Sequence, residues 1–407
     1  MNRQRSPSWR VREQRGSVMM ITLGVIVVVT TLGATAVIRS LGEHSLGQRY
    51  ATRERAFELA EAALDQASFN LRTPQDAADD ILAATLPTGT FHVGDTPDTS
   101  VIQLGPTLWQ VTARGDSGQE QRRIEAVFQL VPQSVFQFAL FGNQQVNVSG
   151  SAFTDSYDSS LGPYNGDPNS PGYNAAHNGD VGTNSVNTGG VTVGGSIFVD
   201  GQVAVGAGVA DPVSVVAGYN PAFITGGTSP PTDTQDVVAQ SSAFPMPSVT
   251  VPAGLTCSDF TVAGNTTETL APGDYCYRNL TIQGGGTLTT TGAGEVHVYL
   301  TGALIARGNS SVGYAANPSQ MQFLMSSSGS AEIEEGTLTG STSFYGALYG
   351  PNSTINITGN AEVFGSIIAR QVNVSGSAVV HYDEHLSTST TVPNLYQRAL
   401  ISWRELN

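Results

Sequence analysis

This chain of 407 residues contains no lysine, and charged residues of both signs make up only 13% of it. Its 18 basic residues are all arginine, against 33 Asp and Glu, so the formal net charge is −15. Beyond residue 72 there are eight arginines and 27 acidic residues, a formal charge of −19. Such an acidic segment argues against nucleic-acid binding, which depends on basic patches. It is compatible with divalent cations or with plain solubility.

The chain also lacks the sequence motifs of common catalytic and cofactor sites. No G-x-S-x-G, H-E-x-x-H or phosphate-binding loop occurs. The two cysteines, Cys257 and Cys276, form no CxxC pair, and neither their spacing nor their neighbours indicate zinc. The composition includes 46 glycines and is 40% hydrophobic. It therefore suits extended β structure with many turns better than disorder.

A long apolar run does occur near the N-terminus, where residues 17–38 carry no charge. A helix of this length spans about 33 Å, enough for a bilayer core. The segment before it has one acidic residue, Glu13, and five arginines. These are Arg3, Arg5, Arg10, Arg12 and Arg15. The positive-inside rule then predicts that residues 1–16 stay in the cytoplasm and that the rest is exported. A plain single-span anchor is the alternative, because the run is too long for a cleaved signal.

The apolar run continues into a segment with helical periodicity. From residue 40 to residue 72 there is no proline, and apolar or small residues recur at helical spacing. These are Phe57, Ala60, Leu64, Ala67 and Leu71. Thr73-Pro74 then ends the pattern, because proline disfavours helical backbone in the residue before it. The sequence therefore predicts a transmembrane and amphipathic helix over residues 17–72.

The stretches QRGSVMMITLGVIVVVTTLGATAVIRS (14–40) and AFELAEAALDQA (56–67) resemble the N-terminal helix of type IV pilins, most closely that of PilX-type minor pilins. In that family a peptidase cuts after a leader glycine and leaves the apolar helix on the mature protein. The resemblance implies a cut between Gly16 and Ser17. It also implies that the helix contacts the inner membrane, other pilins and the assembly machinery. Major pilins have Phe and Glu at the first and fifth mature positions, where this chain has Ser17 and Ile21. That departure favours a minor, initiating or tip-located pilin.

Residues 73–135 predict a small α+β connector that packs on the outer half of the helix. Residues 77–85 predict one or two helical turns, and four segments predict strands. The strands are 91–93, 100–104, 108–115 and 122–131, the last two joined as a hairpin by a turn-rich linker. Their apolar face would consist of Leu108, Val111, Ile124, Val127 and Phe128. Pro132 marks the predicted boundary of the connector.

Beyond residue 135 the chain contains internal repeats. The octet QVNVSGSA occurs at 145–152 and again at 371–378. The segments that begin at Tyr345 and Phe364 align at an offset of 19 residues. Short β-branched runs with Gly, Asn or Ser at the corners predict a mainly β protein, with a right-handed parallel β-helix over residues 136–386. A β-sandwich is the alternative, but it needs no such repeat.

The stretches EVHVYLTGALIA and FGSIIARQVNVSGSAVVHYDEHL resemble the β-helical domain found behind PilX-type N-termini and, more distantly, the bactofilin solenoids. Neither family is catalytic as far as the resemblance implies, so we expect no enzyme activity. Segments 152–180 and 209–256 fit the coil pattern poorly and predict loops or a cap. Residues 387–407 predict a tail with a short helix around Tyr396–Leu406 that covers the open end of the solenoid.

The two cysteines lie 19 residues apart, which is one coil by the repeat. An even number of cysteines in an exported chain favours a disulfide between Cys257 and Cys276 over two free thiols. Stacked coils lie about 4.8 Å apart, and a disulfide accepts such a Cα separation. A bridge there would tie an irregular segment to the regular solenoid.

Two acidic segments raise the question of metal binding. The loop 155–180 is rich in oxygen ligands and contains Asp155, Asp158, Asp167 and Asp180, but it lacks the EF-hand order. We prefer a turn-rich surface loop and predict no cofactor, with calcium as the alternative. The segment HYDEH (381–385) has two His and two acidic residues. Its position at the last predicted coil favours a cap over a metal site.

Together these patterns predict a membrane-anchored, exported, pilin-like protein in type IV pilus assembly or in tip or adhesive function. The exported part would lie in the periplasm or on a pilus, with the solenoid as a structural module or one that binds a surface or a polysaccharide. The alternatives are a tethered β-helical polysaccharide-cleaving enzyme and a self-associating structural solenoid. Lateral polymerisation of the exported part would identify the latter.

The enzyme alternative depends on paired carboxylates, which cleave glycosidic bonds when they lie within about 5 to 9 Å of each other. Strand alternation places Glu332 and Glu334 on one face of the chain. We expect the double substitution Glu332→Gln/Glu334→Gln to leave the protein's function unchanged. An assay for release of reducing sugar ends checks this, and activity that the substitution abolishes would establish the enzyme alternative.

Overall fold

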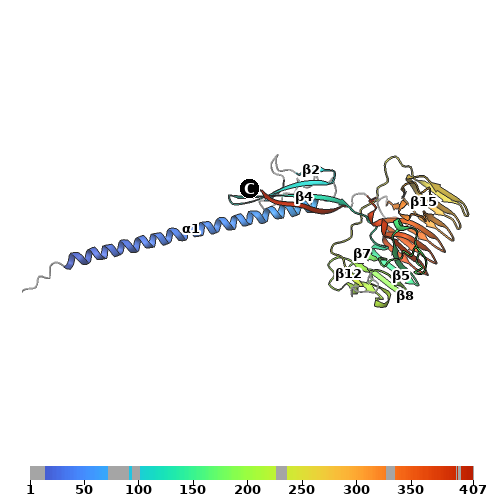
Figure 1. Ribbon diagram of the computed structural model, residues 1–407, viewed down its shortest axis with the longest axis horizontal. Helices are drawn as coiled ribbons and strands as arrows, with labels where there is room; N and C mark the ends of the chain where they lie inside the picture. The colour runs from blue at the N-terminus through green and yellow to red at the C-terminus, as the bar shows by residue number, and fades with distance from the viewer. Residues whose placement is uncertain are drawn as a thin grey trace, which may run out of the picture. The chain divides into compact units, whose positions relative to one another are not determined.

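A computed structural model describes residues 14–71, 91–93, 101–225, 236–326, 335–390, 392 and 396–406. The chain forms two compact units, the first made of residues 1–131 with 398–407 and the second of residues 132–397. The first unit contains helix α1 (Gln14–Asn70), drawn in blue in Figure 1, and a small antiparallel sheet. The second is a stack of parallel strands. A mainly β protein with a long N-terminal helix and a parallel β-helix is therefore confirmed.

Helix α1 is continuous over 57 residues. Its N-terminal half exposes a dense series of large apolar side chains, from Met19 through Leu41. The threonines of this half bond back to the preceding turn: Thr30 and Thr35 donate to the carbonyl oxygens of Ile26 and Thr31 at 2.8 and 2.7 Å. Hydroxyl groups satisfied in this way suit an apolar environment. The helix is long and apolar enough to cross a membrane.

The C-terminal half of α1 is amphipathic, as predicted. Its buried residues recur every three or four positions and are mostly alanine. They are Ala56, Ala60, Ala63, Leu64, Ala67 and Leu71. Small side chains on this face let the sheet approach closely: a Cβ on Gly115 would collide with the backbone of Ala56 and Ala60. The predicted face is therefore correct except at Phe57, which is half-buried and packs edge-on against Trp403.

The sheet of the first unit has the order β1-β3-β4-β25, with β2 paired to β3. Its strands are β1 (Phe91–Val93), β2 (Ile102–Gly105), β3 (Leu108–Ser117), β4 (Glu120–Pro132) and β25 (Tyr396–Leu406). The predicted hairpin is β3-β4, whose turn needs positive φ at Gly118 (63°). Alternate residues of β4 are buried. They are Ile124, Ala126, Phe128 and Leu130. The helical turns predicted for 77–85 lie outside the described residues.

Strand β25 corrects the prediction for the C-terminus. Residues Tyr396–Leu406 form a strand beside β4, and not a helix that caps the solenoid. Two ion pairs hold β25 in place: Arg122 binds Glu405 at 2.6 Å, and Arg404 binds Glu125 at 2.7 Å. The helix prediction was wrong because the apolar residues of this segment also fit a strand, and a partner strand far away in sequence decided between them.

The second unit is a solenoid of short strands. In chain order they are β5 (Leu140–Gly150), β6 (Phe153–Tyr157), β7 (Val181–Thr183), β8 (Val191–Gly195), β9 (Phe198–Val199), β10 (Val203–Val205), β11 (Val216–Ala217), β12 (Val237–Ala239), β13 (Ser258–Val262), β14 (Thr267–Leu270), β15 (Gly273–Ile282), β16 (Thr287–Thr290), β17 (Val296–Leu300), β18 (Leu304–Ala306), β19 (Ser311–Gly313), β20 (Met321–Met325), β21 (Glu335–Leu338), β22 (Ser343–Ile357), β23 (Glu362–Val374) and β24 (Val379–Asp383). Every pairing recorded between these strands is parallel.

The order of coils in the stack differs from the order in the chain. Strand β23 pairs with β5, so that Val372 lies beside Val146 and Asn373 beside Asn147. The repeated octet is therefore stacked on itself, 226 residues apart. From β5 the chain winds outward through β7, β10 and β12. It then begins again with β13 and winds back to β24, which pairs with β6. Figure 1 shows the green strands β5, β7 and β8 in the same stack as the orange to red strands that end with β24.

The coils share one apolar core but differ in length. Ser343 pairs with Glu362, which gives the predicted 19-residue coil, whereas Val296 pairs with Met321. Inward positions stack apolar side chains coil upon coil. One such row is Leu288, Val312, Phe344, Val363 and Val380, all fully buried. Burial of each such side chain stabilises the fold by roughly 1.5–3 kcal/mol.

One corner of the solenoid requires glycine. Gly359, Gly376 and Gly150 take positive φ values of 80°, 87° and 85° on three consecutive coils. A Cβ at Gly376 or Gly150 would collide with the backbone of the glycine on the preceding coil. Both the backbone conformation and the close approach therefore exclude other residues, which accounts for the SG and TG pairs of the repeat.

Residues 241–256, which we call the strap, run along the outside of the stack and connect its two ends. The strap covers a row of outward apolar side chains, including Tyr299, Leu324 and Tyr349. It begins where Asn184 exchanges two hydrogen bonds with Phe244, and it ends at Cys257. Cys257 forms the predicted disulfide with Cys276, with Cα atoms 4.6 Å apart. The poor coil pattern before Cys257 thus reflects a crossing segment.

We expect the double substitution Cys257→Ser/Cys276→Ser to lower the free energy of unfolding by about 3 kcal/mol, because the bridge closes a loop of about 20 residues. The β-rich circular dichroism should remain, since the core rows do not depend on the bridge. Thermal unfolding with and without reductant measures the effect. Two alkylatable thiols in the native protein would contradict the bridge.

Candidate functional site

A group of interacting polar side chains lies on the side of the solenoid formed by β22, β23, β24, β6 and β9. Parallel register places four outward residues in one row across consecutive coils, and a fifth, Asp200, directly follows β9, the strand paired with β6. They are Tyr345, Phe364, His381, Asp155 and Asp200. We call the last three the polar row. The row is assembled from both halves of the chain, because β24 and β6 meet only through the reordered stack.

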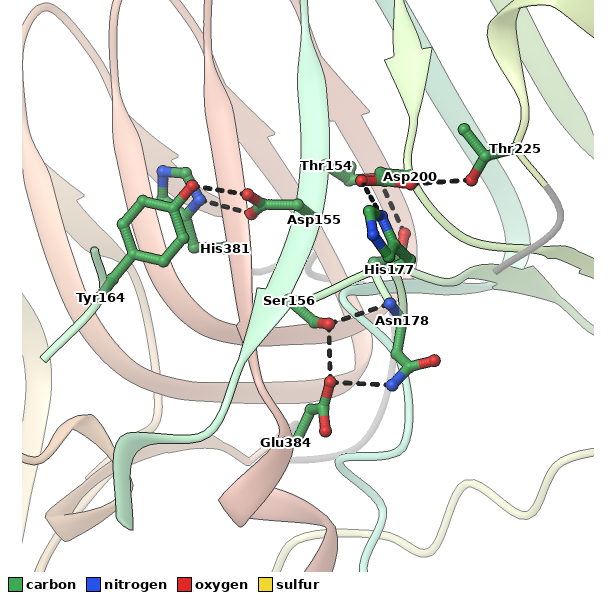
Figure 2. Close-up of polar contacts among 11 residues, drawn as sticks. Thr154, Asp155, Ser156, Tyr164, His177, Asn178, Asp200, Thr225, His381 and Glu384 are labelled. Atoms are coloured by element: carbon green, nitrogen blue, oxygen red, sulfur yellow. Dashed lines mark hydrogen bonds and ion pairs between the residues drawn. The ribbon is translucent and has the colours of Figure 1, made fainter. Parts of the chain in front are cut away.

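His381 and Asp155 form the centre of the polar row (Figure 2). The His381 Nδ1 lies 2.5 Å from one carboxylate oxygen of Asp155, and the Tyr164 hydroxyl donates to the other at 2.6 Å. His381 and Asp155 are buried, with 8% and 3% of their surface exposed. The Tyr164 ring stacks on the His381 ring with centroids 3.8 Å apart. Burial, followed by the hydrogen bond to Asp155, raises the pKa of Tyr164.

Asp200 occupies the next coil and has its own partners. His177 Nδ1 lies 2.7 Å from one of its oxygens, and the Thr225 hydroxyl donates to the other at 2.8 Å. Nearby, the Ser156 hydroxyl donates to Glu384 at 2.7 Å and accepts the Asn178 backbone N–H. Figure 2 shows that Tyr164, His177 and Asn178, all from residues 158–178, reach back to the strands.

These contacts fix the segment 158–178, which we call the covering loop, onto the solenoid. Among the described residues, neither His381 nor His177 bonds to a serine, threonine or cysteine that it could activate as a nucleophile. The aromatic rings beside His381 stack face to face: Tyr345 and Phe364 lie 4.7 Å apart with an interplanar angle of 10°. The facing sides of the Tyr345 and Phe364 rings are therefore occupied by contact with each other. The arrangement orients and buries polar groups, and its evident role is to dock the loop.

The four aspartates proposed as calcium ligands have separate roles. Asp155 belongs to the polar row, and Asp158 caps a short 3-10 helix by accepting the Ser160 N–H. Asp167 bonds within its own turn, and Asp180 accepts the Gln202 N–H at 2.7 Å. Burial raises the pKa of Asp180. Among the described residues no three His, Cys, Asp or Glu side chains come together as a metal site.

The HYDEH segment is not at the end of the stack, contrary to the prediction. Strand β24 lies between β23 and β6, so residues 381–385 belong to a coil in the middle of the stack and not at its end. Asp383 is fully buried, and one of its oxygens accepts the backbone N–H groups of Ser159 and His385. Burial raises the pKa of Asp383. The carboxylates proposed for the enzyme alternative, Glu332 and Glu334, lie outside the described residues.

A second polar group lies on the side of β15 and β17. His297 Nδ1 is 2.8 Å from Asp274, and its Nε2 is 3.3 Å from Glu295. With Tyr299 and Thr390 these residues line an open hollow of about 400 Å³. The hollow is shallow and polar, and it brings together one histidine and two exposed carboxylates.

Gly16 and Ser17, the predicted cleavage site, lie at the start of α1, which begins at Gln14. The adjoining apolar half of the helix is exposed throughout its described side chains. It is the most apolar exposed surface in the described part of the first unit.

Sequence reasoning missed the pairs His381–Asp155, His177–Asp200 and His297–Asp274. The signal for the first was present: the octet repeats at an offset of 226, and the same offset carries Asp155 onto His381. The repeated octet indicates coils, and in the structure its two copies also lie side by side. The other two pairs each span 23 residues, an offset that matches neither the 19-residue nor the 226-residue repeat, so no repeat predicts them.

The family model described as a domain of unknown function (DUF7305) matches residues 256–389. The match spans the coils from β13 to β24, a part of the solenoid. No curated protein matches the chain.

Two solved structures are similar over large parts of the chain. The competence-associated pilin ComZ from Thermus thermophilus is 14% identical, with 87% of this chain and 97% of that one covered and a TM-score of 0.27. The DUF3494 domain of an ice-binding protein from Shewanella frigidimarina is 16% identical, with 62% and 98% covered and a TM-score of 0.35. At these scores neither likeness assigns a function.

We expect Asp155→Ala to free the covering loop, because the substitution leaves the half-buried Tyr164 hydroxyl and the buried His381 ring without their acceptor. Each unpaired buried group costs about 1–3 kcal/mol. Limited proteolysis should then cut within residues 158–178 of the variant. Asp167→Ala, an exposed position in the same loop, is the control. Equal resistance of the two variants would mean that the polar row does not hold the loop.

Asp383 predicts a pH dependence of stability. Its pKa in the folded protein is raised above the ordinary value of 3.8, so its charged form is disfavoured by folding. The associated loss of stability is absent below pH 3.8, grows as the pH rises through the folded pKa, and is complete above it. As the pH rises through this window, the free energy of unfolding of Asp383→Asn should therefore increase relative to that of the wild type. Denaturation at a series of pH values tests it, with Asp158→Asn as the control, and a constant difference would refute it.

Proposed function

We propose that this protein is an exported, pilin-like subunit that is anchored in a bacterial inner membrane by α1 and carries the solenoid as its exported module. The observation that carries the proposal is the division of α1 into two halves. Its N-terminal half exposes apolar side chains on every side, and its C-terminal half buries a stripe of alanines against a small sheet. One continuous helix can thus serve a membrane or a filament core at one end and a folded domain at the other.

Charge supports one orientation of this anchor. All five arginines before the apolar half precede residue 16, and the chain beyond residue 72 is strongly acidic. The positive-inside rule then keeps the N-terminus in the cytoplasm and exports both the sheet and the solenoid. The disulfide supports the same placement, because disulfides persist in oxidising compartments outside the cytoplasm.

The finer role that we propose is that of a minor or tip-located pilin in a type IV pilus. Ile21 stands at the fifth position after the proposed cut, where major pilins have glutamate. A subunit without that carboxylate lacks one polar contact between neighbouring helices in the filament. The solenoid is also far larger than the sheet unit and would be accommodated most easily at an end of a filament. The proposed partners are other pilins and the assembly machinery.

Mass spectrometry of the mature protein tests this function. We expect the N-terminus to be Ser17, and Gly16→Leu, which removes the small residue before the cut, to leave the leader in place. Gly24→Leu, in the middle of the apolar half, is the control and should be processed normally. An intact Met1, or a cut after residue 38, would refute the pilin role and leave a plain anchor or a signal.

A further inference from the structure

One side of the solenoid presents an ordered polar surface that the strap and the covering loop do not occupy. Its central row runs by parallel register across β13, β15, β18, β21, β22, β23, β5 and β8. The polar residues among its described side chains are Thr261, Thr281, Asn356, Asn373, Asn147 and Thr192. A second row lies two positions further along each strand and holds Gln283, Thr339, Thr358, Ser375 and Ser149. We call these two rows the neutral face; its residues are half-exposed or exposed.

The two rows hold no acidic side chain among their described residues, although the chain has a net charge of −15, and the exposed Asp259–Arg278 ion pair lies beside them, two positions before Thr261 on β13. Ile305 interrupts the central row and Arg307 interrupts the second, both on one coil. The other sides of the solenoid differ from the neutral face. On one the strap covers an apolar row, and on another the polar row combines acidic side chains with aromatic rings. Amides and hydroxyls both donate and accept hydrogen bonds, so this surface offers a ligand hydrogen bonds but little charge and little apolar contact.

The amides of the central row are held in place by one another. Asn147 Nδ2 donates to Asn373 Oδ1 at 2.7 Å, and Asn373 Nδ2 donates to Asn356 Oδ1 at 2.8 Å. Each amide has two N–H donors and an oxygen with two lone pairs, so one bond along the row leaves further capacity for a ligand. The rows repeat at the coil spacing of about 4.8 Å. Ordered groups lose little conformational freedom when they bind.

We propose that the neutral face binds an extended, neutral, β-linked polysaccharide that lies along the solenoid axis. Such a chain is uncharged, presents hydroxyl groups at a regular repeat of similar size, and remains straight over several coils. Many weak hydrogen bonds along one chain add to a useful affinity. The two rows are less suited to a protein partner, because the centre of a stable protein interface needs apolar and aromatic residues. They are also less suited to an anionic polymer, because they offer it a single arginine, Arg307.

The test is retention of the full-length protein, in mild detergent, on microcrystalline cellulose and on chitin particles, with amylose resin as a helical glucan for comparison. We expect retention on at least one of the first two and none on amylose. Raising the salt from about 0.1 M to about 1 M should leave retention within twofold, because no charges are involved.

A matched pair of variants locates the site. Thr261→Arg/Thr281→Arg places two arginines on the neutral face, and Thr267→Arg/Thr287→Arg places two on the adjoining side of the same two coils. In each pair one threonine is exposed and the other half-exposed. The first variant should bind roughly tenfold more weakly, and the second should bind like the wild type. Circular dichroism and thermal unfolding show that both variants fold.

Three outcomes would overturn the proposal: retention on neither cellulose nor chitin, equal loss in both variants, or loss in high salt. A change of oligomeric state in the first variant, with glycan binding intact, would identify a second copy as the occupant and also overturn it. The proposal rests on the proposed function only in that the solenoid is exported. Glycan retention by a protein whose N-terminus is not Ser17 would refute the pilin role alone. A Ser17 N-terminus without glycan retention would refute the glycan site alone.

Discussion

The parallel pairing of β23 with β5 is the contact on which the solenoid depends. It joins the coils made by residues 140–239 to those made by residues 258–383, which the strap connects along the chain. The joint continues in β24 and β6, and it aligns the Asn and Gly positions of the two octets. Without it the chain would have two short stacks, each with an additional open strand edge and an exposed end of its core.

The reordered stack creates requirements that the rest of the second unit meets. The chain must travel from one end of the stack to the other, and it does so as the strap, which at the same time covers Tyr299, Leu324 and Tyr349. Asn184 fixes the start of the strap, and the disulfide fixes its end. The covering loop, in turn, closes the joint from outside through Tyr164 and the buried His381–Asp155 pair. The polar row is therefore best understood as part of the architecture.

The first unit shows the same dependence on distant segments. Its sheet is complete only when β25, the C-terminal strand, lies beside β4, although the whole solenoid separates the two in the chain. The alanine stripe of α1 and Gly115 bring helix and sheet into close contact, while the other half of the helix has no cover of its own. This contrast within one helix supports the proposed anchoring role, and the neutral face gives the solenoid a surface of its own.

Local patterns in the sequence determined much of this protein. The uncharged run 17–38, the spacing of Ala60, Leu64, Ala67 and Leu71, the β3-β4 hairpin and the coil pattern each follow from neighbours in the chain, because helical and strand periods are local properties. The Cys257–Cys276 bridge was also predictable, because one coil separates the two residues. Tertiary structure alone decided the order of the coils, the strand at Tyr396–Leu406, and the meeting of Asp155 with His381. These depend on which distant strand edges pair, and parallel backbone hydrogen bonding is nearly indifferent to sequence, so closure of the whole stack selects the pairing.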